Sequence, residues 1–148
     1  NGLASIVCPN GNFLNLSSNE PKIFNKIEVG RVYLDGSSKV TSTDGIVRDR
    51  IRMAVNGLVV VSVLLDENDD LIGDPWCETK GLPIVTNSNA PLVDCLEEDL
   101  SQLIGRIEPN VLLDNEQLEE VVRRGARHTC KSEIGKKPEV SVVISRLV

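Results

Sequence analysis

The chain has 148 residues and a net charge of −6 at pH 7; 41% of its residues are hydrophobic, 26% are charged and only 3% are aromatic. These values are typical of a folded globular protein with a core of Leu, Ile and Val, and they exclude a disordered or fibrous chain. No apolar run approaches the ~20 residues that span a bilayer, and the acidic balance disfavours a free-standing nucleic-acid binder, which normally clusters Lys and Arg against phosphates.

The cysteines and the start of the chain bear on location and metal binding. Four cysteines, with no CxxC pair among them, are spread along the chain at Cys8, Cys77, Cys95 and Cys130. We expect reduced thiols, no zinc site and no cofactor in this chain. The start at Asn1 lacks the basic region and cleavage site of a signal peptide. We therefore expect a cytoplasmic protein without a membrane partner and, because the chain does not begin with Met, a piece of a longer protein.

The first 36 residues predict a β-rich segment. Four short extended runs are expected there, at residues 3–8, 13–16, 23–29 and 31–35. The first two runs flank Pro9-Asn10-Gly11-Asn12, an Asn-Gly turn signal that favours a tight hairpin. Residues 37–43 are rich in Ser and Thr without periodicity, which predicts a linker.

A helix is predicted after this linker, ending at Asn56-Gly57. Either Thr43 or Asp44 can cap its start, and the Gly supplies a stop signal. Its apolar residues recur at helical spacing, at Val47, Ile51, Ala54 and Val55.

The most apolar stretch of the chain is Leu58–Leu65, in which seven of eight residues are apolar and four are Val. This run predicts a central strand that is covered on both faces. The acidic turn at 66–70 predicts a hairpin to a second strand at 71–77, and a third strand is expected at 140–147. We expect these three strands to form one sheet.

Two amphipathic helices are predicted between the second and third strands. The first covers residues 92–107 and has a stripe at Leu92, Leu96, Leu100, Leu103 and Ile107. The second extends to about Ile134 and begins at Asp114, which forms a capping-box pattern with Gln117. Its inward positions are expected at Leu118, Val121, Val122, Gly125, Thr129 and Cys130.

Neither helix carries a recognisable catalytic group. The acidic residues of the first helix lie toward its start, where the helix dipole favours them, so a solvated face is preferred over a metal or general-acid role. They are Asp94, Glu97, Glu98 and Asp99. His128 is the only histidine, and spacing identifies no Ser or Cys partner for it, which favours a surface or packing role. An independent small enzyme is therefore not expected.

The expected fold class is α+β, with a three-stranded sheet covered on one face by two α-helices. Apolar side chains alternate toward both faces of this sheet, and exposing a few hundred Å² of the second face would cost several kcal/mol at ~25 cal/mol per Å². We therefore expect a partner there, either a second copy of the chain or an upstream domain. The residues chosen as interface candidates are Val59, Val61, Val63, Val140, Val142 and Ile144.

Several short motifs follow one another in a distinctive order along the chain. They are Asn1-Gly2, Cys8-Pro9, residues 29–36 (VGRVYLDG), residues 48–54 (RDRIRMA), Asn56-Gly57, residues 80–83 (KGLP) and residues 135–138 (GKKP). In order and spacing they resemble the C-terminal part of ribonuclease J, particularly its α-proteobacterial form, in the β-CASP group of metallo-β-lactamase-fold nucleases. Residues 76–79 (WCET) match no pattern of that family.

The resemblance implies a parent protein that processes and degrades RNA as a zinc-dependent 5′ to 3′ exonuclease and endonuclease, with a metal-bound hydroxide as nucleophile. The metal ligands of that family lie in His- and Asp-rich motifs upstream of Asn1, so no catalytic or metal residue is carried over and this chain is not expected to be an enzyme. Residues 1–36 would end the metallo-β-lactamase-like domain, 37–43 would be a linker, and 44–148 would be the small C-terminal domain.

Two roles for such a region are considered. The first is a non-catalytic one that supports oligomerisation and the nuclease core, with a second copy and the upstream nuclease domains as partners and RNA bound through the parent. The alternative is an accessory module that contacts RNA through Arg48, Arg50 and Arg52, and through Arg123, Arg124 and Arg127. The first three arginines lie mainly outside the apolar stripe of their helix. They are therefore also consistent with an ordinary solvent-exposed helix face that does not contact RNA.

Overall fold

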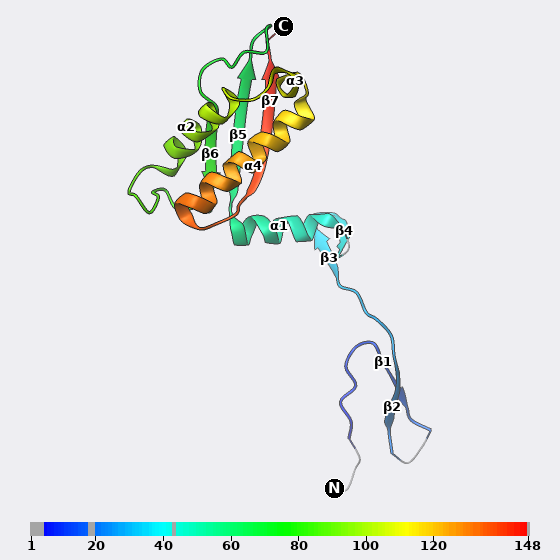
Figure 1. Ribbon diagram of the computed structural model, residues 1–148. Coiled ribbons are helices and arrows are strands. Elements are labelled where there is room, and N and C mark those ends of the chain that lie inside the picture. The colour runs from blue at the N-terminus through cyan, green and yellow to red at the C-terminus, as the bar shows by residue number, and fades with distance from the viewer. Residues whose placement is uncertain (1–4, 18–19, 43, 148) are drawn as a thin grey trace. The chain divides into compact units, whose positions relative to one another are not determined.

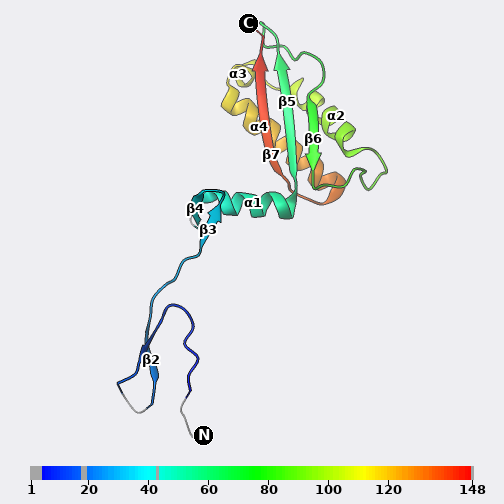
Figure 2. The ribbon, with the colours of Figure 1, turned by 180° about the vertical axis from the view of Figure 1, so that it is seen from behind.

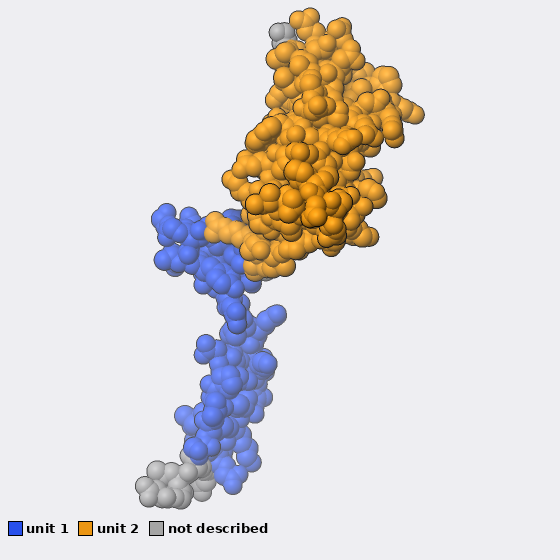
Figure 3. Space-filling view, turned by 90° about the vertical axis from the view of Figure 1, so that its left-hand side faces the viewer, with its two compact units in different colours: residues 1–48 blue, residues 49–148 orange. Residues whose placement is uncertain are grey.

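The computed structural model describes residues 5–17, 20–42 and 44–147. The chain divides into two compact units, residues 1–48 and 49–148 (Figure 3). Strands and helices both occur, as the predicted α+β class requires. Among the described residues, no helix combines the length and the apolar character needed to cross a membrane.

Unit 1 consists of two small antiparallel ribbons. Strand β1 (Asn12–Asn15) pairs with β2 (Lys22–Lys26), and β3 (Val32–Asp35) pairs with β4 (Ser38–Thr41). In the first ribbon the rings of Phe13 and Phe24 meet edge to face, with centroids 6.0 Å apart. Two-stranded ribbons of this size are marginally stable by themselves in water.

The predicted hairpin across residues 9–12 is not formed. Residues 5–8 are not in a strand, and the start of that predicted run, residues 3–4, lies outside the described residues. The turn itself exists, because the backbone N–H of Asn12 donates to the carbonyl of Pro9 at 3.2 Å. However, Gly11 accepts a bond from Ile27 N at 2.7 Å, so this turn packs beside the end of β2 and β1 pairs with β2 instead.

The predicted linker is also corrected, because residues 38–41 form strand β4. Asp35 pairs with Ser38, so the turn between β3 and β4 contains two residues, Gly36 and Ser37. Gly36 has φ +59°, a left-handed conformation that glycine adopts without strain. The Ser- and Thr-rich stretch therefore folds back onto β3 instead of crossing open space.

Helix α1 (Gly45–Asn56) forms where it was predicted, and Gly57 follows it with φ +82°. Thr43, one of the two predicted caps, lies outside the described residues. The other, Asp44, accepts a hydrogen bond from the backbone N–H of Thr41 at 2.7 Å. No residue of α1 is buried; of its apolar stripe, Val47 is half-buried, and Ile51, Ala54 and Val55 are exposed.

The three predicted strands of unit 2 form one sheet (Figure 1). Strand β5 (Leu58–Leu65) is central, with β6 (Trp76–Lys80) antiparallel on one side and β7 (Glu139–Arg146) parallel on the other. Strand β6 begins later than the predicted residue 71. Leu71 pairs with Leu65 in an isolated bridge and Ile72 N donates to the Leu64 carbonyl at 2.8 Å, but the chain then bends at Gly73, which has φ +67°, so continuous pairing begins only at Trp76. In the turn before Leu71, the Asp66 carboxylate accepts the backbone N–H groups of Asp70 and Asn68, each at 2.8 Å, and these bonds lower its pKa.

Helices α2 (Leu92–Ile104) and α4 (Asn115–Ile134) lie on the same face of the sheet, and a short helix, α3 (Pro109–Leu112), connects them (Figure 1). Helix α2 ends at Ile104, three residues before the predicted residue 107, and Gly105 is its C-cap. The core between helices and sheet is made of fully buried aliphatic side chains, each worth roughly 1.5–3 kcal/mol on burial. They include Val59, Val61, Val63, Leu65, Leu92, Leu96, Leu100, Leu118 and Val122.

The start of α4 is fixed as predicted by its N-cap. The Asp114 carboxylate accepts hydrogen bonds from the backbone N–H groups of Glu116 at 2.9 Å and Gln117 at 3.2 Å, and from the Gln117 side chain at 2.7 Å. The bonds from Gln117 make the largest contribution to lowering the pKa of Asp114. The cap orients α4 across the sheet and thereby positions the charged side chains of its outer face.

The close approach of α2 and α4 at Gly125 gives a stability prediction. Replacing Gly by Ala in a helix normally stabilises by roughly 1 kcal/mol. At Gly125 the new methyl group would lie 2.5 Å from Leu103 Cδ2 and 3.0 Å from Leu100 Cδ2, and Leu100 is fully buried. We expect overpacking to prevail, so that Gly125→Ala lowers the free energy of unfolding in urea by about 1–3 kcal/mol.

Gly105→Ala is the matched control, because a methyl group there would lie 3.4 Å from the Ser101 carbonyl oxygen, an ordinary contact. It should leave stability unchanged or raise it. If Gly125→Ala were as stable as this control, the helices would not pack as closely as described.

Candidate functional site

The sheet of unit 2 has one face that α2 and α4 leave uncovered over the described residues (Figure 2). Strand pairing arranges the residues of this face in rows that cross β6, β5 and β7. Three successive rows contain Trp76, Ser62 and Val143; Glu78, Val60 and Ser141; and Lys80, Leu58 and Glu139. We call these nine residues the open face.

The open face is partly apolar. Trp76 is 54% exposed and Val143 is 49% exposed, while Leu58 and Val60 on the central strand are half-buried. Serines at 62 and 141 lie between the apolar side chains. An exposed Trp beside aliphatic side chains is a composition that protein interfaces favour.

The six predicted interface residues belong to the opposite, helix-covered face, so this choice was wrong. Val59, Val61 and Val63 are fully buried, and Val140 is 8% exposed. Val142 and Ile144 pack against the same core. A period of two separates the faces of a strand but does not say which face the helices cover. Side chains buried in the core of the chain cannot also contact a partner.

The structure does not gather Arg48, Arg50 and Arg52 into one patch, although all three are exposed on α1. Successive helical residues are about 100° apart around the axis, so Arg48 and Arg52 share one side while Arg50 points to nearly the opposite side. The apolar residues of α1 are exposed as well, Ile51 by 58% and Val55 by 66%.

A basic groove lies beside the C-terminal half of α4. It has a volume of about 510 Å³ and is lined by Arg124, Arg127, His128, Lys131, Lys137, Pro138 and Glu139. The first four residues come from one side of α4. Gly135 ends the helix with φ +68°, and the chain then turns back so that residues 137–139 complete the groove.

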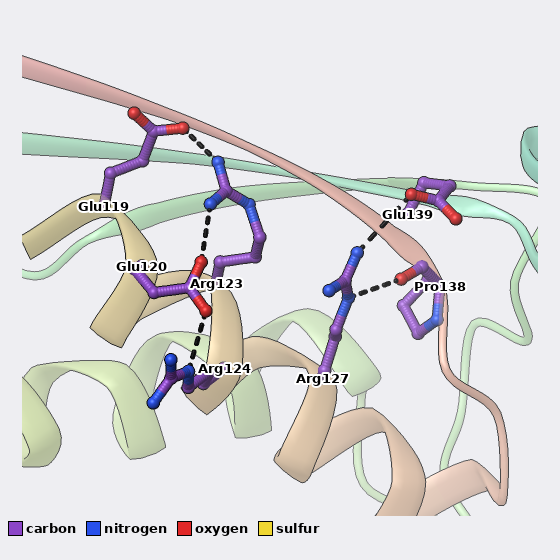
Figure 4. Close-up of polar contacts among 7 residues, drawn as sticks. All are labelled: Glu119, Glu120, Arg123, Arg124, Arg127, Pro138 and Glu139. Atoms are coloured by element: carbon purple, nitrogen blue, oxygen red, sulfur yellow. Dashed lines mark hydrogen bonds and ion pairs between the residues drawn. The ribbon is translucent and has the colours of Figure 1, made fainter. Parts of the chain in front are cut away.

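Two arginines of the groove are held in place by neighbouring acceptors (Figure 4). Arg124 Nε donates to Glu120 Oε1 at 2.7 Å. Arg127 Nε donates to the Pro138 carbonyl at 3.2 Å, and its Nη2 donates to Glu139 Oε2 at 3.4 Å. The bonds of Arg127 tie α4 to the start of β7, and the bond to Glu120 orients the guanidinium group of Arg124.

The third predicted arginine of this helix, Arg123, is not part of the groove. It forms ion pairs with Glu119 and with Glu120, the latter at 2.9 Å (Figure 4). Hydrogen bonds from Arg124, and next from Arg123, lower the pKa of Glu120. Arg123 therefore serves a surface ion-pair network, each pair of which is worth a few tenths of a kcal/mol.

Of the groove, sequence reasoning named only Arg124 and Arg127 as RNA contacts and missed the other five lining residues, among them His128, Lys131 and Lys137. His128 and Lys131 follow Arg124 at i+4 and i+7, so helical spacing alone could have grouped them with it. Lys137 joins them only because the chain reverses after α4, which the sequence pattern did not specify. His128 is exposed, in agreement with its predicted surface role.

Two of the four acidic residues of α2 form hydrogen bonds to neighbouring elements. Glu97 Oε1 accepts the backbone N–H of Cys77 at 2.8 Å, and Asp99 Oδ2 accepts the Thr129 hydroxyl at 2.7 Å. These bonds connect α2 to β6 and to α4. Within the part of the chain that the structure describes, no three His, Cys, Asp or Glu side chains are grouped as a metal ion requires.

Two thiols lie in the core. Burial, with smaller contributions from Glu97 and Cys130, raises the pKa of Cys77 from 9.0 to about 12. Burial likewise raises the pKa of Cys130 to about 11. Both thiols are therefore neutral in the folded chain, whereas unfolded thiols ionise near pH 9. The contribution of these thiols to stability is complete below pH 9 and is lost as the pH rises toward these folded-state pKa values.

Comparison with known proteins gives two findings. A family model described as the ribonuclease J C-terminal domain matches residues 45–147. A curated relative from Sinorhizobium meliloti, named ribonuclease J, is 30% identical over 138 residues. This match covers 93% of the present chain but only 24% of the relative, so the chain spans about a quarter of the length of that protein.

The burial of the thiols predicts their reactivity. At about pH 8, alkylation should label Cys8, which is exposed, first, and should label Cys77 and Cys130 only as fast as the chain opens, because thiolate is the reactive form. Mass spectrometry of tryptic peptides reads each site. In urea all four cysteines should react at similar rates. Native-state labelling of Cys77 as rapid as that of Cys8 would contradict the described core.

Proposed function

Because the chain belongs to the ribonuclease J C-terminal domain family, we propose that it is the non-catalytic C-terminal region of a nuclease of the ribonuclease J type. The parent protein would hydrolyse RNA with zinc in domains outside this chain. The observation that carries the proposal is the family match over residues 45–147. The four free thiols fit a reducing compartment such as the cytoplasm.

The described residues do not fit a zinc centre of the kind that the family resemblance implies. The chain has one histidine, and the described part contains no cluster of three metal-ligating side chains. We therefore derive no hydrolytic step from this chain, and its contribution lies in contacts.

Unit 1 is proposed to be part of a larger β domain, which would be the upstream nuclease core. Its ribbons and the segments beside them expose large apolar side chains that a free-standing domain would bury. Val7 is 85% exposed, Leu16 is 72%, Phe24 is 67% and Leu34 is 77%. Covering them with the remainder of a sheet would supply the core that unit 1 lacks among its described residues.

The open face is proposed to bind a second copy of the chain. If a twofold axis ran along β5, each β6 would lie over the partner's β7, in the aligned manner of packed sheets. The row that contains Trp76 and Val143 would then place each tryptophan against a valine of the other copy. The row that contains Lys80 and Glu139 would likewise place opposite charges together. In the single chain Lys80 already pairs with Glu78, and Glu139 with Arg127. The face is thus self-complementary in both polarity and charge.

Val143→Glu tests this dimer. The side chain is 49% exposed, so the change should leave the fold intact by circular dichroism while placing a carboxylate at the contact. We expect the dimer dissociation constant of the full 148-residue chain, measured by sedimentation equilibrium, to rise by about tenfold or more.

Ile84→Glu is the control, because Ile84 is 84% exposed but lies in the loop after β6, outside the open face. It introduces the same charge and should not alter the dissociation constant. A wild-type chain that stays monomeric at high concentration, or equal effects of the two variants, would contradict self-association through the open face.

The proposal also predicts that the isolated chain has no nuclease activity. The purified chain, incubated with Zn²⁺ and 5′-phosphorylated single-stranded RNA, should leave the RNA intact on a denaturing gel. The same incubation with a chelator provides the baseline. Cleavage that requires zinc and disappears with the chelator would show that the chain has a nuclease site of its own and would contradict the non-catalytic proposal.

A further inference from the structure

The basic groove concentrates positive charge in an acidic chain. Its lining contains four Lys or Arg side chains and one Glu, a net charge of +3 with a neutral imidazole, whereas the whole chain carries −6. A local field of this sign attracts anions in spite of the overall charge.

Two of these charges lack a counterion. Lys131 and Lys137 are exposed, and neither forms an ion pair with any residue that the structure describes. Arg124 uses only Nε in its bond to Glu120, and Arg127 uses Nε and Nη2. The remaining guanidinium N–H groups are available to an incoming acceptor.

The charges form a line rather than a cage. Arg124, Arg127 and Lys131 follow one side of α4 over two turns, a distance of about 10 Å. A row of exposed charges suits a linear polyanion, which adds many modest contacts, better than a single small anion. The C-terminal end of a helix carries partial negative charge, so anion binding here depends on Lys131 in the last turn and Lys137 just beyond it.

We propose that the basic groove, through Lys131, Lys137, Arg124 and Arg127, binds the phosphate backbone of single-stranded RNA. This inference rests on the proposed function, which makes RNA the ligand of the parent protein. An acidic peptide is the competing ligand. The groove favours RNA because its only apolar lining residue is Pro138, whereas bound peptides usually insert apolar anchors into pockets.

The test uses the full chain and a fluorescein-labelled oligouridylate of about 12 nucleotides, a length within the usual site sizes for single strands. Fluorescence anisotropy gives the dissociation constant at several salt concentrations. We expect Lys131→Ala/Lys137→Ala to weaken binding by about tenfold or more at low salt. The slope of log K against log salt should fall by about 1.4, or about 0.7 for each lost phosphate contact.

The matched control is Lys26→Ala/Lys39→Ala, which removes the same charge from exposed positions on β2 and β4. It should change RNA affinity less than twofold. Equal losses in the two double variants, or no saturable binding by the wild-type chain, would overturn the proposal. Tighter binding of an oligoglutamate of similar length, with the same sensitivity to Lys131→Ala/Lys137→Ala, would assign the groove to an acidic protein instead.

The same variant separates this inference from the dimer. Lys131 and Lys137 lie outside the open face, so Lys131→Ala/Lys137→Ala should sediment like the wild type. A variant that loses RNA affinity and keeps its dissociation constant for self-association supports the groove. A variant that keeps wild-type RNA affinity refutes the groove and leaves the dimer proposal standing.

Discussion

The structure of unit 2 depends on the alternation of side chains along β5. Val59, Val61, Val63 and Leu65 point to one face and are fully buried, while Leu58 and Val60 point to the other and are only half-buried. Helices α2 and α4 cover the first set of side chains, and no helix that the structure describes in unit 2 packs on the second set. A central strand with apolar groups on both sides but helices on one side leaves an apolar surface that water solvates poorly.

Helix α4 connects this core to the surface charges. Its inner side places Leu118, Val122, Ala126 and Cys130 against the sheet and α2. Its outer side first presents a network of Glu and Arg pairs and then, toward the C-terminus, the basic groove, in which Arg127 pairs with Glu139 and Lys131 forms no ion pair with a described residue. Because the N-cap and the Gly125 contact fix how the helix lies, the same element sets both the packing and the position of the basic groove. Self-association would use the open face and RNA contact the basic groove, two neighbouring surfaces that share Glu139.

Much of the fold could be predicted because its signals are local. The Asp114 cap, the apolar run of β5 and the leucine stripe of α2 each lie within a few consecutive residues, and the structure confirms them. The failures have two causes. One is a local signal that was not recognised, the two-residue turn at Gly36, which makes part of the predicted linker into β4. The other is non-local, because alternation could not say which side of β5 the helices would cover. The groove could not be predicted for the same non-local reason, because Lys137 comes close to α4 only through the chain reversal at Gly135.

The emission of Trp76 gives the most direct measurement of the central claim, that the open face meets a second copy. It is the only tryptophan of the chain and lies 54% exposed on that face, so all tryptophan fluorescence reports on it. The account predicts that the emission maximum shifts to shorter wavelength as protein concentration rises, because association removes the indole from water. An emission maximum that remained at the wavelength of solvent-exposed tryptophan while the chain associated would contradict the account.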